Sequence, residues 1–101
     1  MPHDDAFADV LAANEAYARD FRLAALHGRA AKGLALLTCM DSRVEPLSML
    51  GLLPGDAKIF RNAGARVTED VLRTLVLATS LLGVDRVMVV AHTDCRMAGG
   101  S

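Results

Sequence analysis

Aromatic side chains and an excess of charge of either sign are both scarce in this chain. It has 101 residues, of which 4% are aromatic and 52% are apolar, and it contains no tryptophan. The core must therefore be built from leucine, valine, alanine and methionine, and a chain of this length forms one domain at most. Eleven basic and twelve acidic residues are mixed along the sequence, so no basic stripe exists to hold a nucleic acid backbone. We expect no nucleic acid partner.

Long apolar runs are absent as well. The apolar stretches are much shorter than the roughly 20 residues that a membrane-spanning helix needs, so we expect no membrane association. No charged segment followed by an apolar one opens the sequence, so we expect no secretion signal. Only two cysteines occur, Cys39 and Cys95. In a chain of this kind they are expected to be reduced thiols in the cytoplasm, available for metal binding or for chemistry.

Both cysteines belong to short polar clusters that follow apolar runs. Cys39-Met40-Asp41-Ser42-Arg43 comes after the run 33–38, and His92-Thr93-Asp94-Cys95 comes after the run 87–91. Two thiolates and an imidazole form a ligand set that zinc prefers. Three protein ligands leave a fourth position open, which is typical of catalytic zinc sites.

The hydrophobic periodicity alternates between helical and extended segments. It predicts helices over 4–26, 45–50 and 69–82, with Thr68 as N-cap and Gly83 as C-cap of the last, and strands over 33–38, 57–61 and 86–91. Strands that are apolar throughout and separated by helices predict an α/β fold with a parallel sheet core flanked by helices. In such sheets, sites form beyond the carboxyl ends of the strands. We therefore expect the two polar clusters to meet there, with Cys95 turning back toward a metal bound by His92.

Three motifs, found between Leu34 and Met97, resemble those of the β-class carbonic anhydrases. They are Cys-x-Asp-x-Arg at 39–43, Arg-Asn-Ala-Gly at 61–64 and His-x-x-Cys at 92–95. The resemblance implies one zinc ion per chain and the reversible hydration of carbon dioxide to bicarbonate and a proton through zinc-bound hydroxide, the reaction of a lyase. It further implies the roles of the residues: Cys39, His92 and Cys95 as zinc ligands, Asp41 and Arg43 as the catalytic dyad, and Ala63 and Gly64 at the substrate pocket.

The proposed dyad has a physical rationale. Asp41 can accept a hydrogen bond from the bound hydroxide and fix its orientation, while Arg43 can hold Asp41 bidentately. That clamp keeps the carboxylate ionised and off the metal. Without it Asp41 could become a fourth zinc ligand and exclude water, and the sequence leaves open which of the two arrangements applies.

The resemblance also implies a homodimer or larger homo-oligomer, in which a helical arm over residues 4–27 lies against a partner subunit. Two departures from the family pattern stand out. Arg96 directly follows Cys95, where the family usually has glycine, and the sequence stops soon after, where family members continue with further helices and another strand. We expect residues 1–101 to form a single, incomplete domain of low stability, because a few short strands with an exposed edge form a poor sheet.

Other interpretations remain. The chain can be a zinc-binding but catalytically silent homologue, or a hydrolase of carbonyl sulfide or carbon disulfide with the same fold. Cys39 can be a packed core thiol, Asp41 and Arg43 a loop-fixing ion pair, and Asn62 and Gly64 simple turn formers. A thiol enzyme is disfavoured, because the spacing from Cys39 to Arg43 is too short for a phosphatase loop and no Cys-x-x-Cys pair occurs.

Overall fold

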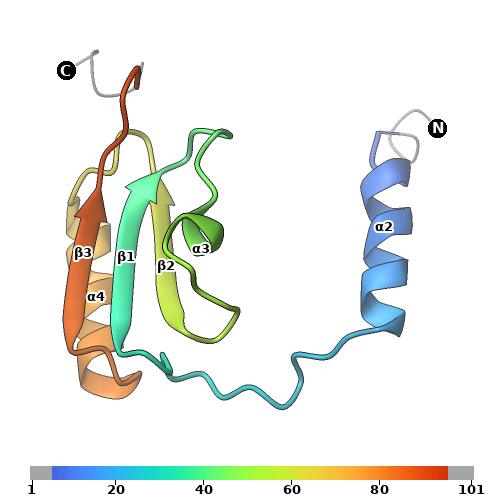
Figure 1. The fold of residues 1–101 in the computed structure, drawn as a ribbon, viewed down its shortest axis with the longest axis horizontal. Coiled ribbons are helices and arrows are strands. Elements are labelled where there is room, and N and C mark those ends of the chain that lie inside the picture. Colours follow the sequence, from blue (N-terminus) through green and yellow to red (C-terminus); the bar gives the residue numbers. More distant parts are fainter. Residues whose placement is uncertain (1–5, 96–101) are drawn as a thin grey trace.

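A parallel three-stranded sheet forms the centre of the protein (Figure 1). The structure, a computed structural model, describes residues 6–95. The elements in chain order are α2 (Ala8–Arg19), β1 (Leu34–Cys39), α3 (Pro46–Met49), β2 (Ala57–Asn62), α4 (Glu69–Leu81) and β3 (Arg86–Val90). The strand order is β2-β1-β3 and both pairings are parallel. The predicted α/β fold is thus confirmed. Arg96, which departs from the family pattern, lies outside the described residues.

Strand β1 is the buried centre of the sheet. All six of its residues are buried, as expected for a continuous apolar run between two neighbouring strands. The sequence predicts this strand over 33–38, whereas the observed strand begins and ends one residue later, at Leu34 and Cys39. Gly33 has a φ of 65°, in the left-handed region, so it lies outside the extended strand that begins at the next residue. At the other end, Cys39 still pairs with Asn62 of β2.

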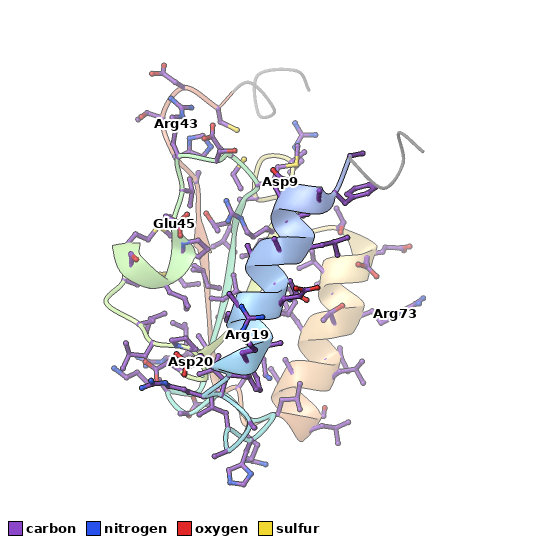
Figure 2. The ribbon with its side chains drawn as sticks, turned by 90° about the vertical axis from the view of Figure 1, so that its right-hand side faces the viewer. Asp9, Arg19, Asp20, Arg43, Glu45 and Arg73 are labelled. Carbon is purple, nitrogen blue, oxygen red and sulfur yellow. The ribbon has the colours of Figure 1, made fainter. Side chains whose placement is uncertain are left out.

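The helices cover the two faces of the sheet unequally. Helix α4 lies along one face and the short helix α3 lies on the other, as Figures 1 and 2 show from two sides. The core between β1 and α4 consists of two buried clusters, and Phe60 and Leu75 pack against both of them. The clusters are Ala30, Ala35, Ala78 and Val84, and Leu37, Ala65 and Val71.

Helix α4 begins where the sequence predicts. Thr68 is the N-cap, and its side-chain oxygen accepts a hydrogen bond from Val71 N at 3.3 Å. The prediction for the other end was wrong by one residue: Leu82 is the C-cap and Gly83 follows it with a φ of 77°. Glycine takes this left-handed position after the cap because it has no Cβ to clash.

Helix α2 is shorter than the predicted helix over 4–26. It ends at Arg19 with Asp20 as C-cap, while residues 4 and 5 lie outside the described residues. None of its residues is buried, so tertiary packing adds nothing to extend it. After α2 the chain returns to the rest of the molecule just before β1. There, Ala31 N donates to Gly55 O at 2.9 Å and Lys32 N donates to Asp56 O at 2.8 Å, in the segment before β2. Figure 1 shows α2 apart from the sheet at the end of this connection.

Considerable apolar surface is exposed on three elements. The exposed residues include Phe7, Val10, Leu11 and Tyr17 at α2, Leu72, Val76, Leu77 and Leu81 on α4, and Val87, Met88 and Val89 on β3. No helix among residues 6–95 is long and apolar enough to cross a membrane.

The topology brings the two polar clusters to one edge of the sheet. From β1 the chain passes to β2 on one side and then crosses to β3 on the other, so the strand order reverses about β1. The loops after β1 and β3 are therefore neighbours at the carboxyl ends of adjacent strands, where open α/β sheets place their sites.

Candidate metal centre

Three side chains from the two clusters converge at this edge. Cys39 is the last residue of β1, and His92 and Cys95 follow β3. Their ligand atoms all lie within 4.8 Å of one another, and the sulfur atoms of Cys39 and Cys95 are 3.6 Å apart. The structure therefore brings together the three residues predicted as metal ligands.

A tight turn returns Cys95 to His92. Asp94 has a φ of 56°, in the left-handed region that aspartate enters more readily than most residues. Its carbonyl oxygen accepts a hydrogen bond from Arg43 Nη2 at 3.3 Å, so the turn is linked to the loop after β1. The two residues between His92 and Cys95 therefore form the turn that brings both side chains to the same site.

The imidazole of His92 is oriented for metal binding. Its Nδ1 lies 2.8 Å from Thr93 O, and a carbonyl only accepts, so Nδ1 is the protonated nitrogen of the neutral ring. Its Nε2 is buried and has no hydrogen-bond partner among the described residues. A buried lone pair without a donor is costly, and a metal ion between Nε2 and the two sulfur atoms would remove that cost. The donor set thus fits a zinc ion.

The thiol of Cys39 lies in an environment that favours the thiolate. The side chain is 1% exposed, and Gly64 N–H donates to its sulfur over 3.4 Å. When its ring is protonated, the neighbouring His92 side chain, foremost, together with backbone N–H groups, lowers the pKa of Cys39 to about 6 against the opposing effect of burial. In return, Cys39 is the main cause that raises the pKa of His92. Deprotonated thiols are the form in which cysteine binds metals.

Asp41 is held by Arg43 through three hydrogen bonds. Arg43 donates from its backbone N and from Nε to Oδ1, at 2.8 and 3.0 Å, and from Nη2 to Oδ2 at 2.7 Å. These bonds, the side-chain ones first, hold the pKa of Asp41 well below its usual range, and Asp41 in turn raises the pKa of Arg43. Oδ2 lies 3.8 Å from His92 Nε2, so the carboxylate borders the three-ligand cluster.

An open hollow lies beside the cluster. It has a volume of about 870 Å³ and is lined by residues 39–43 together with Asp94 and Cys95. Ala63 and Gly64 do not line it, and Gly64 contacts the site through the sulfur of Cys39. Their assignment to a substrate pocket remains a prediction. Figure 2 shows Arg43 at this end of the molecule.

Two neighbouring residues of β2 support the site in ways that the motifs do not reveal. Arg61 donates to three backbone carbonyls of residues 39–44. Asn62 accepts from Arg66 N at 2.9 Å and donates to Arg66 O at 2.7 Å, closing the loop that presents Gly64 to Cys39. Asn62 is thus a turn former, and the turn has a contact with the candidate ligand set. The Arg-Asn-Ala-Gly motif marked this segment without giving either role.

Comparison with known proteins agrees with this geometry. The family model for carbonic anhydrase matches residues 34–100, two thirds of the chain. The chain is 42% identical over 89 residues to β-carbonic anhydrase 1 of Mycobacterium tuberculosis. The chain belongs to the β-carbonic anhydrase family. The aligned part covers 88% of this chain and 54% of that relative, so the chain spans about half the length of the mycobacterial enzyme.

Solved structures show the same fold. The carbonic anhydrase from Streptococcus mutans superposes with a TM-score of 0.82 at 44% identity, covering 89% of this chain and 54% of that one. The family relatives also include proteins with another named activity. A carbon disulfide hydrolase of an Acidianus species is 50% identical over 64 residues, which cover 63% of this chain and 31% of that protein.

Proposed function

We propose that this β-carbonic anhydrase family member binds one zinc ion through Cys39 Sγ, His92 Nε2 and Cys95 Sγ and catalyses the reversible hydration of carbon dioxide to bicarbonate. The observation that carries the proposal is the buried, unpartnered Nε2 of His92 beside two thiol sulfur atoms, all within 4.8 Å. When bound, zinc would supply a Lewis acid that makes water nucleophilic at neutral pH.

Asp41 supplies the hydrogen-bond acceptor of the reaction. Its Oδ2 takes one bond from Arg43 and lies 3.8 Å from His92 Nε2, so a lone pair is left for a water molecule beside the cluster. A carboxylate accepts a hydrogen bond from such a water and thereby orients the water oxygen toward the substrate. Because its pKa is low, Asp41 stays ionised at neutral pH and can act only as an acceptor.

Arg43 keeps that carboxylate in place. Its fork binds both oxygens of Asp41, and its Nη2 also reaches the Asp94 carbonyl between the two metal-binding loops. Bidentate geometry of this kind resists rotation of the carboxylate. We therefore assign the open arrangement, in which Asp41 stays with Arg43 and leaves the fourth metal position to water.

A stopped-flow assay of carbon dioxide hydration by the zinc-loaded protein tests this function. We expect activity in the unaltered protein and a loss of about 10²- to 10⁴-fold in the Asp41→Asn variant with its zinc retained. Asp20→Asn is the matched control, because Asp20 forms a similar pair with Arg22, two residues on, at 3.4 Å on the exposed surface. Zinc-loaded protein without activity would leave a catalytically silent zinc-binding homologue.

A second candidate is the hydrolysis of carbon disulfide or carbonyl sulfide. The 50% identity to the Acidianus carbon disulfide hydrolase over 64 residues favours it. Both substrates are linear and apolar like carbon dioxide, so the same site could accept them. The ratio of kcat/KM for carbon dioxide to kcat/KM for carbon disulfide, measured on one preparation, separates the two functions.

We further propose that the chain acts as a homodimer or larger homo-oligomer in the cytoplasm. Exposed apolar residues on α2, α4 and β3 offer surface for self-association. A relative from Sordaria macrospora, 28% identical and similar in fold with a TM-score of 0.69, is described as tetrameric. Sedimentation velocity at several protein concentrations tests the assembly, and a monomer throughout would contradict it.

A further inference from the structure

We propose that Arg61 is a positioning residue of the metal centre, which fixes the backbone of the loop from Cys39 to Val44; the inference rests on the proposed function. Arg61 lies on β2, next to the end of the strand, and pairs in register with Thr38 of β1. Arg61 therefore lies beside the end of β1, one register position before Cys39, the last residue of that strand.

Three hydrogen bonds connect Arg61 to this loop. Its Nε donates to Cys39 O at 3.0 Å, and its Nη2 donates to Asp41 O at 2.9 Å and to Val44 O at 3.1 Å. One guanidinium thus holds the backbone of a candidate zinc ligand and of the candidate catalytic carboxylate at once. The relative position of the Cys39 sulfur and the Asp41 carboxylate depends on these bonds.

The loop itself has no regular secondary structure. Residues 40–45 belong to no helix or strand. Within the loop, Val44 N donates to Asp41 O and Arg43 N donates to Asp41 Oδ1. These local bonds shape the turn, and Arg43 Nη2 links it to Asp94 O after β3. Among residues 6–95, its hydrogen bonds to the sheet come from Met40 N, which donates to Asn62 O, and from Arg61. Functional groups keep their geometry when the residues around them are fixed in this way.

The contacts require arginine in particular. The three carbonyl oxygens are reached from two separate nitrogen atoms of the planar guanidinium, whereas a lysine presents all its donors on one compact ammonium. No carboxylate among residues 6–95 forms an ion pair with Arg61. Its hydrogen-bonding capacity is therefore directed at the loop backbone rather than at a surface partner.

The test compares Arg61→Lys with Arg86→Lys. Arg86 is the matched control, because its Nε and Nη2 also donate to a backbone carbonyl, that of Lys32, but at the opposite end of the sheet. Two quantities are measured: the zinc dissociation constant by competition with a chelating dye, and amide hydrogen exchange of residues 40–44 in the metal-free protein. Circular dichroism checks that each variant is folded, and Arg61→Gln, which keeps one amide donor group, serves as a second variant.

We expect Arg61→Lys to weaken zinc binding by about 10- to 100-fold and to speed exchange at residues 40–44 by about tenfold or more. Arg86→Lys should change neither quantity. If the unaltered protein binds zinc and both Arg61 variants match it, the inference is overturned while the metal centre stands. If the unaltered protein binds no zinc, the proposed function is overturned; unchanged exchange in Arg61→Lys then overturns the positioning role too, and faster exchange supports it.

Discussion

The sulfur atoms of Cys39 and Cys95 lie 3.6 Å apart, although the two residues are 56 positions apart in the sequence. Only the pairing of β1 with β3 brings them together. Both are free thiols, so their proximity permits either shared binding of a metal ion or oxidation to a disulfide. Metal binding protects the two thiols against oxidation, because a thiolate bound to a metal is not available to attack a disulfide.

Metal-free protein should therefore form an intramolecular disulfide. With oxidised glutathione as the oxidant, the more exposed Cys95 forms the mixed disulfide, and Cys39 then displaces reduced glutathione. Mass spectrometry should show the loss of two hydrogen atoms per chain and no bound glutathione. Zinc-loaded protein should resist, and Cys95→Ser should form no internal disulfide. Free thiols that persist in the metal-free protein would contradict the geometry.

Replacing Arg43 by lysine should reduce catalysis more than metal binding. Lysine supplies one point of charge in place of the fork that holds both oxygens of Asp41. We expect kcat/KM for carbon dioxide hydration to fall by about 10- to 100-fold with the zinc content unchanged. Arg22→Lys, on the exposed Asp20 pair, is the control. Equal activity of the two variants would mean that Arg43 does not position Asp41.

The thiol of Cys39 should titrate far below an ordinary thiol. His92 is the main cause that lowers its pKa from 9.0 to about 6 in the metal-free protein. Because the folded state has the lower pKa, the thiolate stabilises the fold above the ordinary pKa of 9.0, and this contribution is lost as the pH falls through about 6. Ultraviolet absorbance of the thiolate, followed in a Cys95→Ser background, measures the midpoint. His92→Ala should return the midpoint toward 9.0, and an unchanged midpoint in that variant would refute the assigned cause.

Removal of zinc should lower the thermal stability. A ligand at about 100 times its dissociation constant stabilises a protein by about 2.7 kcal/mol. Each kcal/mol shifts Tm by about 4–8 °C in a domain of this size, so chelation should lower Tm by about 10–20 °C. Cys39→Ser should melt at the same temperature with and without zinc. A cooperative unfolding transition of the unaltered protein with a high Tm that does not change when zinc is removed would contradict both the metal centre and the expected low stability of the metal-free chain.

The sheet and its site could be predicted because the patterns that specify them are local. The extended segments of the sequence predicted β1, β2 and β3 to within one residue at each end, and Thr68 marked the start of α4 through its capping side chain. The convergence of Cys39, His92 and Cys95 followed from one rule of parallel sheets, that the carboxyl ends of the strands share an edge. The structure confirms that convergence, while the catalytic roles of Asp41 and Arg43 remain predictions.

The remaining features depend on contacts between distant segments. Arg61 reaches three carbonyls of residues 39–44, and Gly64 reaches the Cys39 sulfur, because β2 pairs with β1 in a register that no local pattern displays. The end of α2 at Arg19 was likewise not predicted, because helical spacing in the sequence continues past that residue. None of the residues of α2 is buried, so no core contact of the helix marks its end.

Zinc stoichiometry tests the central claim most directly. Elemental analysis of the gel-filtered protein, purified under reducing conditions without added metal, should find close to one zinc per chain, and the Cys39→Ser variant should have lost most of it. Little or no zinc in the soluble, reduced protein would mean that Cys39, His92 and Cys95 lie together without forming a metal centre.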